Sequence, residues 1–238
     1  KNIGPAELDL VIVRENTEGE YLGAGGRVHP KLPQEVGIDV SVFTRDGIER
    51  VMRYAFELAL TRPKKQLTLV TKSNAQRHGM VLWDEVFENL KHDFPGITTD
   101  KMLVDAITTR MVLQPQSLDT IVATNLHADI LSDLAAALSG SLGIGPTANI
   151  NPERTFPSMF EPIHGSAFDL VGKDLANPLG AFWSCVMMLE HLQEKKGASL
   201  LMSAIEEVCQ EGRHLPIDLG GNSCTGEVTT AVCAALKK

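Results

Sequence analysis

Two aspartates near the middle of the chain stand at a spacing that could hold a metal ion. Asp129 and Asp133 are four residues apart on a predicted helix, so their carboxylates project from one face about one turn apart. The flanking apolar residues predict a largely buried helix, in which two close carboxylates need a cation as partner. Oxygen ligands suit Mg²⁺ or Mn²⁺, and Asp105, at the end of a predicted strand, is the candidate third ligand. The alternative is a solvated helix face.

Three further side chains could take part in proton transfer or anion binding. Lys72 ends an apolar strand, where burial could lower its pKa enough to make it a proton acceptor. Tyr21 follows the glutamate-rich run ENTEGE and could donate a proton to a carbanion or enol. Arg14 stands at a strand end, where its guanidinium fits a carboxylate. The structural alternatives are a surface lysine, a tyrosine at the rim of a site, and an ion pair between Arg14 and one of those glutamates.

A loop at residues 161–169, EPIHGSAFD, is dense in small and hydrogen-bonding residues. Gly165 and Ala167 permit close approach by a ligand, and Asp169 could accept hydrogen bonds from ribose hydroxyls while repelling a 2′-phosphate. No GxGxxG motif follows a strand, so spacing alone does not predict a dinucleotide site. His164 by itself is more typical of a structural hydrogen-bonding residue.

Alternating strands and helices are predicted to position these residues, which indicates α/β architecture. The predicted strands cover 8–13, 67–71, 102–104 and 118–124. The predicted helices follow Thr44 as N-cap, cover 80–92, run from about 125 to a cap at Gly140, and then cover 179–192, 199–210 and 227–236. Composition changes near residue 140, where a Gly-, Pro- and Asn-rich stretch begins, and we expect a domain boundary there.

Composition excludes several classes of protein. A net charge of -8 without clustered Lys and Arg argues against a nucleic-acid surface. No apolar run is long enough to span a membrane. Four cysteines without CxxC spacing predict reduced thiols and a cytoplasmic protein. The chain has no signal-peptide pattern, lacks an initial Met and reaches its first strand early, so we expect it to start in mid-protein.

An ordered set of segments resembles the isocitrate/isopropylmalate dehydrogenase family. The segments are VRENTEGEY (13–21), TKSN (71–74), VDA (104–106), NLHADILSDL (125–134), NPERTFPSMFEPIHGSAFD (151–169) and ANP (176–178). The similarity extends to about Leu192 and is weaker beyond it. Within the family, TKSNA and VDAITTRMVLQP look like the tartrate/D-malate branch. The 3-isopropylmalate dehydrogenases are the near alternative.

The resemblance implies an activity, a fold and a metal site. The activity is the NAD-dependent, divalent-metal-dependent oxidation and decarboxylation of D-malate- or tartrate-type 2-hydroxyacids. The fold is the α/β fold of the family, truncated at the N-terminus, with residues 1–140 as a small dimerisation and metal-site domain and 141–238 as the C-terminal part of the large NAD-binding domain. Asp105, Asp129 and Asp133 would hold Mn²⁺ or Mg²⁺ in a homodimer with shared active sites, Lys72 and Asp105 coming from the opposite subunit. K⁺ is an additional candidate cofactor.

The resemblance also assigns roles to individual side chains. Lys72 would help remove the hydroxyl proton, Tyr21 would protonate the enolate, and Arg14 would bind a substrate carboxylate. An acid at Asp169 favours NAD over NADP. The implied cofactor-binding residues are Asn74, Glu161, His164, Gly165, Ser166, Ala167, Asp169 and Asn177.

Two departures from the family pattern affect these expectations. The GDGIG-type turn and additional substrate-binding arginines of family members are not found in these residues, so we expect an incomplete large domain and doubtful activity of the chain alone. His127 and Ala128 stand where Phe-Gly is more usual. A non-catalytic regulatory subunit or inactive fragment is the alternative from another class. Retention of Lys72, Tyr21 and the three aspartates disfavours it, because regulation alone needs no proton donor beside a metal.

Overall fold

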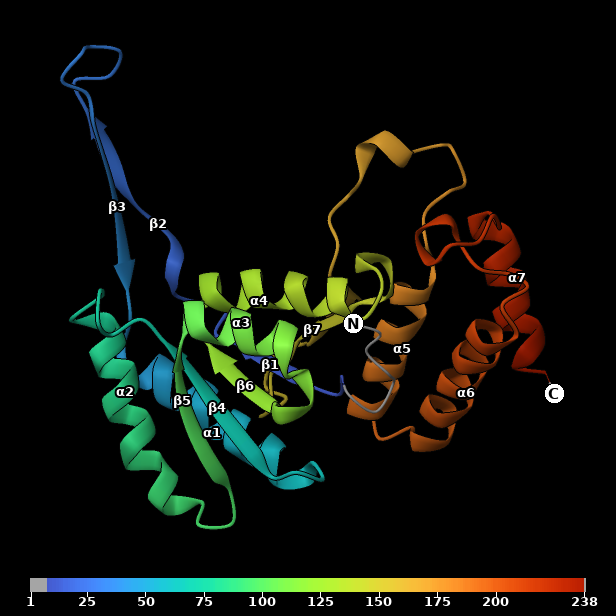
Figure 1. Ribbon diagram of the computed structural model, residues 1–238, viewed down its shortest axis with the longest axis horizontal. Coiled ribbons are helices and arrows are strands. Elements are labelled where there is room, and N and C mark those ends of the chain that lie inside the picture. Colours follow the sequence, from blue (N-terminus) through green and yellow to red (C-terminus); the bar gives the residue numbers. More distant parts are fainter. Residues whose placement is uncertain (1–7, 238) are drawn as a thin grey trace. The chain divides into compact units, whose positions relative to one another are not determined.

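The structure, a computed structural model, describes residues 8–237 and divides into two compact units (Figure 1). Unit 1 ends at Ala135 and unit 2 begins at Ala136. Each unit has a hydrophobic core of its own, and no residue belongs to both. No helix among residues 8–237 is both long and apolar enough to cross a membrane. The residues predicted to do chemistry are therefore positioned by two separate cores.

Unit 1 is built on a four-stranded parallel sheet with the strand order β1-β6-β4-β5. Its strands are β1 (Val11–Arg14), β6 (Thr120–Ala123), β4 (Gln66–Thr71) and β5 (Thr98–Leu103). Every residue of β6, and every residue of β4 after Gln66, is buried. Such continuous burial is typical of a parallel sheet with helices on both faces, which is why these strands are short apolar runs in the sequence.

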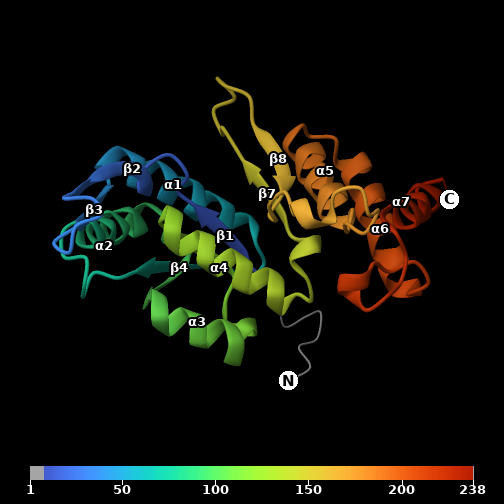
Figure 2. The ribbon, with the colours of Figure 1, turned by 90° about the horizontal axis from the view of Figure 1, so that it is seen from above.

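Four helices cover this sheet. They are α1 (Arg45–Thr61), α2 (Gly79–Leu90), α3 (Val104–Leu113) and α4 (Asn125–Leu138), and Figure 2 shows α1 and α3 on opposite sides of the strands. Thr44 caps α1 as predicted, its side chain accepting a hydrogen bond from the Gly47 N–H at 3.0 Å. Phe56 and Phe87 stack across α1 and α2 with ring centroids 5.4 Å apart. Both rings belong to the core of unit 1.

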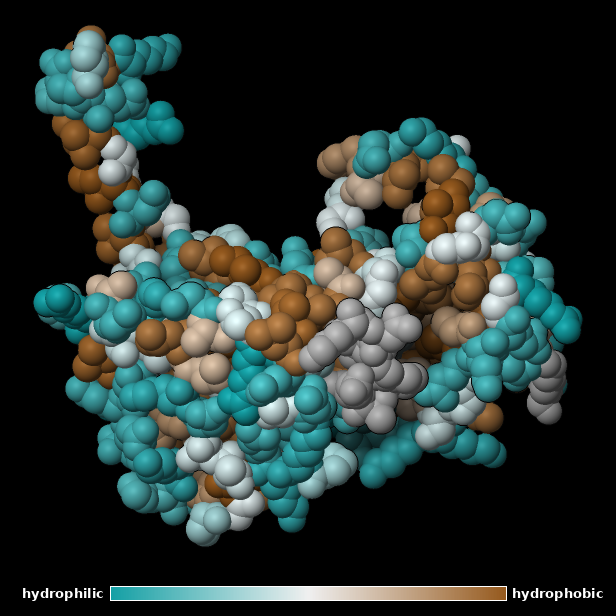
Figure 3. Space-filling view, viewed as in Figure 1, coloured by the Kyte–Doolittle hydropathy of each residue, from teal (hydrophilic) through white to brown (hydrophobic). Residues whose placement is uncertain are grey.

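Residues 19–42 form a two-stranded ribbon, here called the arm. Its strands are β2 (Gly19–Val28) and β3 (Val36–Val42), paired antiparallel from Gly19↔Val42 to Val28↔Val36. Every residue of β3 is exposed, and Figure 3 shows hydrophobic side chains at the surface along the arm. The strand predictions did not include this ribbon. A pair of strands without a covering layer is marginally stable alone in water.

The prediction for the region around Asp105 is wrong in part. The strand predicted at 102–104 is longer and ends at Leu103, and the chain then enters α3, which was not predicted. Asp105 consequently lies in the first turn of a helix instead of at a strand end. The threonines and valines of α3 have low helix propensity. Burial of Ile107 and Met111, one turn apart, outweighs that propensity.

Unit 2 contains three helices and a two-stranded antiparallel sheet. The helices are α5 (Leu179–His191), α6 (Lys195–Glu211) and α7 (Thr225–Ala235), close to the predicted ranges. The sheet, β7 (Pro146–Asn149) with β8 (Met159–Pro162), contacts α5 and was not predicted from its Gly- and Pro-rich stretch. Residues 163–178 form a long loop between β8 and α5. Short 3-10 turns complete the chain at Lys91–Asp93, Pro115–Ser117, Leu142–Ile144, Phe168–Leu170 and Ile217–Leu219.

Candidate functional site

The carboxyl ends of the unit 1 strands bring most of the predicted chemical residues to one edge of the sheet. Arg14 is the last residue of β1, Lys72 follows β4, Asp105 follows β5, and Asn125 begins the helix after β6. Because the four strands are parallel, their carboxyl ends meet at the same edge. This edge is where α/β sheets bind ligands.

Arg14, Tyr21 and Asp129 form one hydrogen-bonded cluster. Nη1 of Arg14 donates to Oδ1 of Asp129 at 2.5 Å, and the Tyr21 hydroxyl donates to Oδ2 of Asp129 at 2.9 Å. Nε and Nη2 of Arg14 donate to Oδ1 of Asn125 at 3.0 and 2.6 Å. The hydrogen bond to Asp129 raises the pKa of Tyr21, because ionisation would place two negative charges side by side. Tyr21 is thus held in its protonated, proton-donating form.

The three glutamates between Arg14 and Tyr21 hold the local backbone. Glu15 is 4% exposed and accepts hydrogen bonds from two N–H groups of its own loop. Glu18 accepts from the N–H and hydroxyl of Thr44, which caps α1. Glu20 accepts from the Thr124 hydroxyl, just before α4. The alternative that Arg14 pairs with one of these glutamates is wrong, since its partners are Asn125 and Asp129.

Lys72 and Asp105 form a second cluster, where the Lys72 ammonium donates to Oδ1 of Asp105. The two residues follow strands whose last residues, Thr71 and Leu103, are paired in register. The hydrogen bond from Lys72 lowers the pKa of Asp105, because it stabilises the ionised carboxylate. Side-chain exposure is 29% for Lys72 and 64% for Asp105, so the pair is open to a ligand on the carboxylate side.

The three predicted metal ligands do not converge within one chain. No group of three or more His, Cys, Asp or Glu side chains arranged for a metal ion occurs among the described residues. Asp129 and Asp133 share one helix, and Asp133 is exposed without a hydrogen-bond or ion-pair partner among residues 8–237. Their carboxylate oxygens are suitable ligands for Mg²⁺ or Mn²⁺. The donor chemistry of the predicted site therefore fits a hard cation, and a complete set needs a ligand from elsewhere.

The predicted burial of α4 is only half correct. Ala128 and Leu131 are fully buried, whereas Ile130 is 51% exposed and the Asp129 side chain 44% exposed. The helix thus buries one face against the rest of unit 1, and its two aspartates lie on the accessible side of the helix. Carboxylates in that position keep much of their hydration, so an internal cation is not needed to stabilise them.

Sequence reasoning assigned no role to the two buried polar residues of the first turn of α4. Asn125 connects Arg14 to the helix and is 5% exposed. His127 is 7% exposed, and its Nδ1 atom has no hydrogen-bond partner among the described residues. Burial lowers the pKa of the His127 imidazole. Asn125 could have been found from its place directly after a predicted strand, where polar residues gather in such sheets.

The remaining predicted residues are exposed or serve local structure. Asn74 lies exposed in the turn after β4, in unit 1. In unit 2, Glu161 is exposed in β8, and the exposed stretch from His164 to Asp169 lies in the long loop before α5. Ala167 has a φ of +41°, which an L-residue seldom adopts. Asn177 donates to Asp218 at 2.9 Å and accepts from the N–H of Leu179, also at 2.9 Å.

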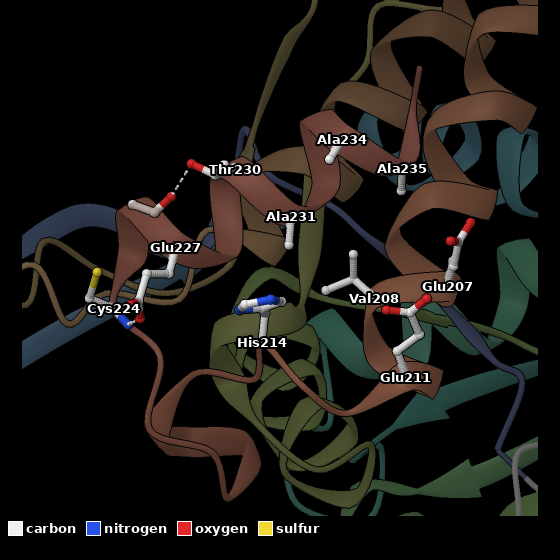
Figure 4. Close-up of a pocket in the computed structure, with 11 residues that line it drawn as sticks. Glu207, Val208, Glu211, His214, Cys224, Glu227, Thr230, Ala231, Ala234 and Ala235 are labelled. Atoms are coloured by element: carbon white, nitrogen blue, oxygen red, sulfur yellow. Dashed lines mark hydrogen bonds between the residues drawn. The ribbon is translucent and has the colours of Figure 1, made fainter. Parts of the chain in front are cut away.

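A groove in unit 2 is lined by none of the predicted site residues (Figure 4). It has a volume of about 620 Å³, between α6 and α7, with an apolar floor and glutamates at its rim. Its lining residues are Glu207, Val208, Glu211, His214, Cys224, Gly226, Glu227, Thr230, Ala231, Ala234 and Ala235. Since the polar clusters lie at the sheet edge of unit 1, we assign the chemistry to that edge.

The chain has a parallel sheet with Arg14, Tyr21, Lys72 and aspartates at its carboxyl edge. Comparison with known families identifies one that matches. The family model described as isocitrate/isopropylmalate dehydrogenase matches residues 1–234, and the chain is a member of that family. The solved isocitrate dehydrogenase from Methylococcus capsulatus has a TM-score of 0.90 and 39% identity, over 96% of this chain and 67% of that one. The predicted family and its α/β fold are confirmed.

Two relatives are closer in sequence. A probable tartrate dehydrogenase/decarboxylase of Agrobacterium vitis is 65% identical over 236 residues, which are 99% of this chain and 66% of that protein. The D-malate dehydrogenase (decarboxylating) of Escherichia coli strain K12 is 48% identical over 96% of this chain and 64% of that protein. The chain spans slightly less than two thirds of each of these relatives.

Proposed function

We propose that the protein oxidises and decarboxylates D-malate or a related C4 2-hydroxyacid such as tartrate, using NAD and a divalent metal. The observation that carries the proposal is the position of Asp129, which accepts hydrogen bonds from both Arg14 and Tyr21. Arg14, which could bind a substrate carboxylate, and Tyr21, which could donate a proton, are thereby hydrogen-bonded to one candidate metal ligand. The names of the two closer relatives support the choice of substrate.

The metal would be held by Asp129 and Asp133 of one subunit together with Asp105 of the partner subunit. All three supply carboxylate oxygens, the ligand type that Mn²⁺ and Mg²⁺ prefer. When bound, the metal supplies Lewis-acid polarisation of the substrate oxygens. The division between subunits agrees with the lack of a three-ligand group within the described part of one chain.

The protein's own side chains would bind the substrate and move its protons. The Arg14 guanidinium would bind a substrate carboxylate with charge-assisted hydrogen bonds. Lys72 would help to remove the hydroxyl proton: after its ammonium has released a proton to solvent, the neutral Nζ would accept the hydroxyl proton as the alcohol is oxidised. NAD, when bound, supplies the hydride acceptor. After loss of CO₂, the Tyr21 hydroxyl would donate its proton to the enolate, a role that fits a phenol held protonated by Asp129.

The two units would have different tasks. Unit 1 and the arm would form the dimerisation and metal-site domain, and unit 2 would be the C-terminal part of the large NAD-binding domain, with a predicted boundary at residue 140. The loop from His164 to Asp169, with Asn177, would bind the adenosine half of NAD. Asn74 and Glu161 are the other predicted cofactor-binding residues. An acid at Asp169 would repel the 2′-phosphate of NADP, so NAD is the preferred cofactor.

The test is an assay of NADH and CO₂ formation with Mn²⁺ and each candidate hydroxyacid. We expect turnover with D-malate or tartrate, a preference for NAD⁺ over NADP⁺, and loss of turnover in Asp129→Asn. Calorimetry without substrate would add an independent measurement, because Asp129→Asn should also weaken Mn²⁺ binding. Turnover of 3-isopropylmalate alone would contradict the substrate. Strong turnover in chelator would contradict the role of the metal.

A further inference from the structure

Asp84 of α2 connects the two segments that carry Lys72 and Asp105. Its Oδ2 atom accepts a hydrogen bond from the Ser73 hydroxyl at 2.9 Å and another from Nζ of Lys101 at 3.0 Å. Ser73 directly follows Lys72, and Lys101 lies on β5 shortly before Asp105. A single carboxylate oxygen therefore contacts both strand ends from which the second cluster projects.

The sheet alone does not fix this cluster. Parallel pairing between β4 and β5 ends at Thr71 and Leu103, so Lys72 and Asp105 lie just beyond the ladder. After Lys72 the chain turns back, its carbonyl accepting the N–H groups of Ala75 and Gln76 at 2.9 Å. Among the described residues, Ser73 is joined to α2 through its hydroxyl bond with Asp84. Without that bond, the turn carrying Lys72 would lose its side-chain attachment to α2.

The surroundings of Asp84 differ from those of an exposed surface ion pair. Its side chain is 15% exposed, and its other oxygen, Oδ1, is buried without a hydrogen-bond partner in the described part of the chain. A buried carboxylate with one unpaired oxygen is unfavourable for stability in itself. Its neighbour Glu85 shows the contrasting case, since that side chain is 57% exposed and pairs with Arg45 at 3.6 Å.

We propose that Asp84, bonded to Ser73 and Lys101, is a positioning residue that sets the contact between Lys72 and Asp105. The proposal rests on the proposed function, in which Lys72 accepts the substrate proton. Asp84 touches neither substrate nor cofactor and acts through Ser73 and the end of β5. Its loss should leave the fold intact and let the Lys72 ammonium move away from Asp105.

The first measurement reports on geometry without any turnover. A carbodiimide activates carboxylates, and an amine in contact then forms an amide bond, so a Lys72–Asp105 cross-link in the folded chain can be quantified by peptide mass spectrometry. We expect the yield to fall to background in Asp84→Ala and in Ser73→Ala. It should persist in Ser73→Thr, which keeps a hydroxyl, and in the matched control Glu85→Gln, which changes the next carboxylate along α2.

The second measurement is steady-state turnover. Misplacing a proton acceptor by about 1 Å can reduce the rate about 100-fold, so we expect kcat to fall by about 10- to 100-fold in Asp84→Ala and Ser73→Ala, with KM for the hydroxyacid nearly unchanged. Ser73→Thr should restore kcat. Ser73→Ala decides the matter if Asp84→Ala does not fold, because it removes only one hydroxyl.

The proposal is supported only if the cross-link and kcat fall together. It is overturned if both persist, if kcat falls with the cross-link intact, or if the cross-link is lost while kcat is retained. Failure of the proposed function gives a different result, namely full turnover in Lys72→Met or no turnover of any hydroxyacid by the unaltered protein. In that case the cross-link alone decides whether Asp84 sets the contact, since its yield does not depend on activity.

Discussion

At the scale of single residues, Asp129 is both a candidate metal ligand and a hydrogen-bond acceptor. Both its oxygens already accept hydrogen bonds, from Arg14 and from Tyr21. The guanidinium also lies 5.6 Å from the centre of the Tyr21 ring. These contacts orient the phenol and keep it protonated, so Tyr21 could deliver a proton close to the position of a bound substrate.

Tyr21→Phe tests the proton-donor role. We expect kcat for decarboxylation to fall by about 100-fold or more, the usual contribution of a positioned general acid. Mn²⁺ affinity, measured by calorimetry, should change little, because the phenol is not a proposed ligand. Tyr54→Phe is the matched control, since Tyr54 is the chain's other tyrosine and packs against the core of unit 1. Equal kcat values for the two variants would contradict the role of Tyr21.

The buried side chain of His127 should make the stability of the fold depend on pH. Burial lowers its pKa below the ordinary value of 6.5, so the unfolded chain binds the proton more readily than the fold does. Its contribution to stability is therefore complete above about pH 6.5 and declines as pH falls from there toward the lowered pKa of the folded state. His127→Phe should show a smaller loss of Tm between pH 7.5 and 5.5 than the unaltered protein. Equal losses would show that another group dominates.

At the scale of elements, the sequence predicted the helices and strands whose positions are determined by local sequence patterns. Helix α1 has a capping threonine and a stop before Pro63, and its observed bounds agree with both. Strands β4 and β6 are apolar runs that had to be buried. Helix α3 could not be read in the same way, because its β-branched residues oppose the helix and its stability depends on tertiary contacts such as the burial of Ile107 and Met111. The pairing of Ser73 with Asp84 depends on α2 lying beside β4, which no local pattern reveals.

The arm shows a different kind of missed signal. The sequence of β3, VGIDVSV, alternates in the way expected of a strand with one buried face, but every residue of the strand is exposed in the described chain. Val36, Ile38, Val40 and Val42 share one face and are each between 39% and 49% exposed. An apolar stripe of this kind marks an interaction surface. We expect the second subunit of the proposed homodimer to cover it.

Ile38→Lys tests that expectation. A charge in the middle of the stripe should weaken dimerisation by about tenfold or more, because a buried unpaired ammonium is strongly unfavourable. Sedimentation equilibrium would measure the dissociation constant. Asp39→Lys is the matched control on the opposite face of the same strand. Comparable weakening by both variants, or by neither, would contradict burial of the Val36–Val42 face.

At the scale of the whole molecule, the proposed metal site makes each subunit incomplete. Asp129 and Asp133 lie on one helix, whereas Asp105 pairs with Lys72, and the described chain contains no group of three ligands. If Asp105 comes from the partner, the ligands of each site are encoded in two copies of the chain. Two inactive variants should then be able to complement each other, which a site within a single chain cannot do.

A mixing experiment decides between these arrangements. Asp105→Asn and Asp129→Asn dimers should each bind Mn²⁺ weakly, and exchange of their subunits creates heterodimers with one intact site and one doubly altered site. Random pairing makes half of the dimers mixed, so about one quarter of the original high-affinity sites should return. Mixing Asp129→Asn with Asp133→Asn is the control, because both changes affect the same subunit's share and neither site of that heterodimer is intact. Calorimetric recovery in the first mixture alone would establish sharing, whereas no recovery in either would show that the three aspartates do not form one site across the dimer.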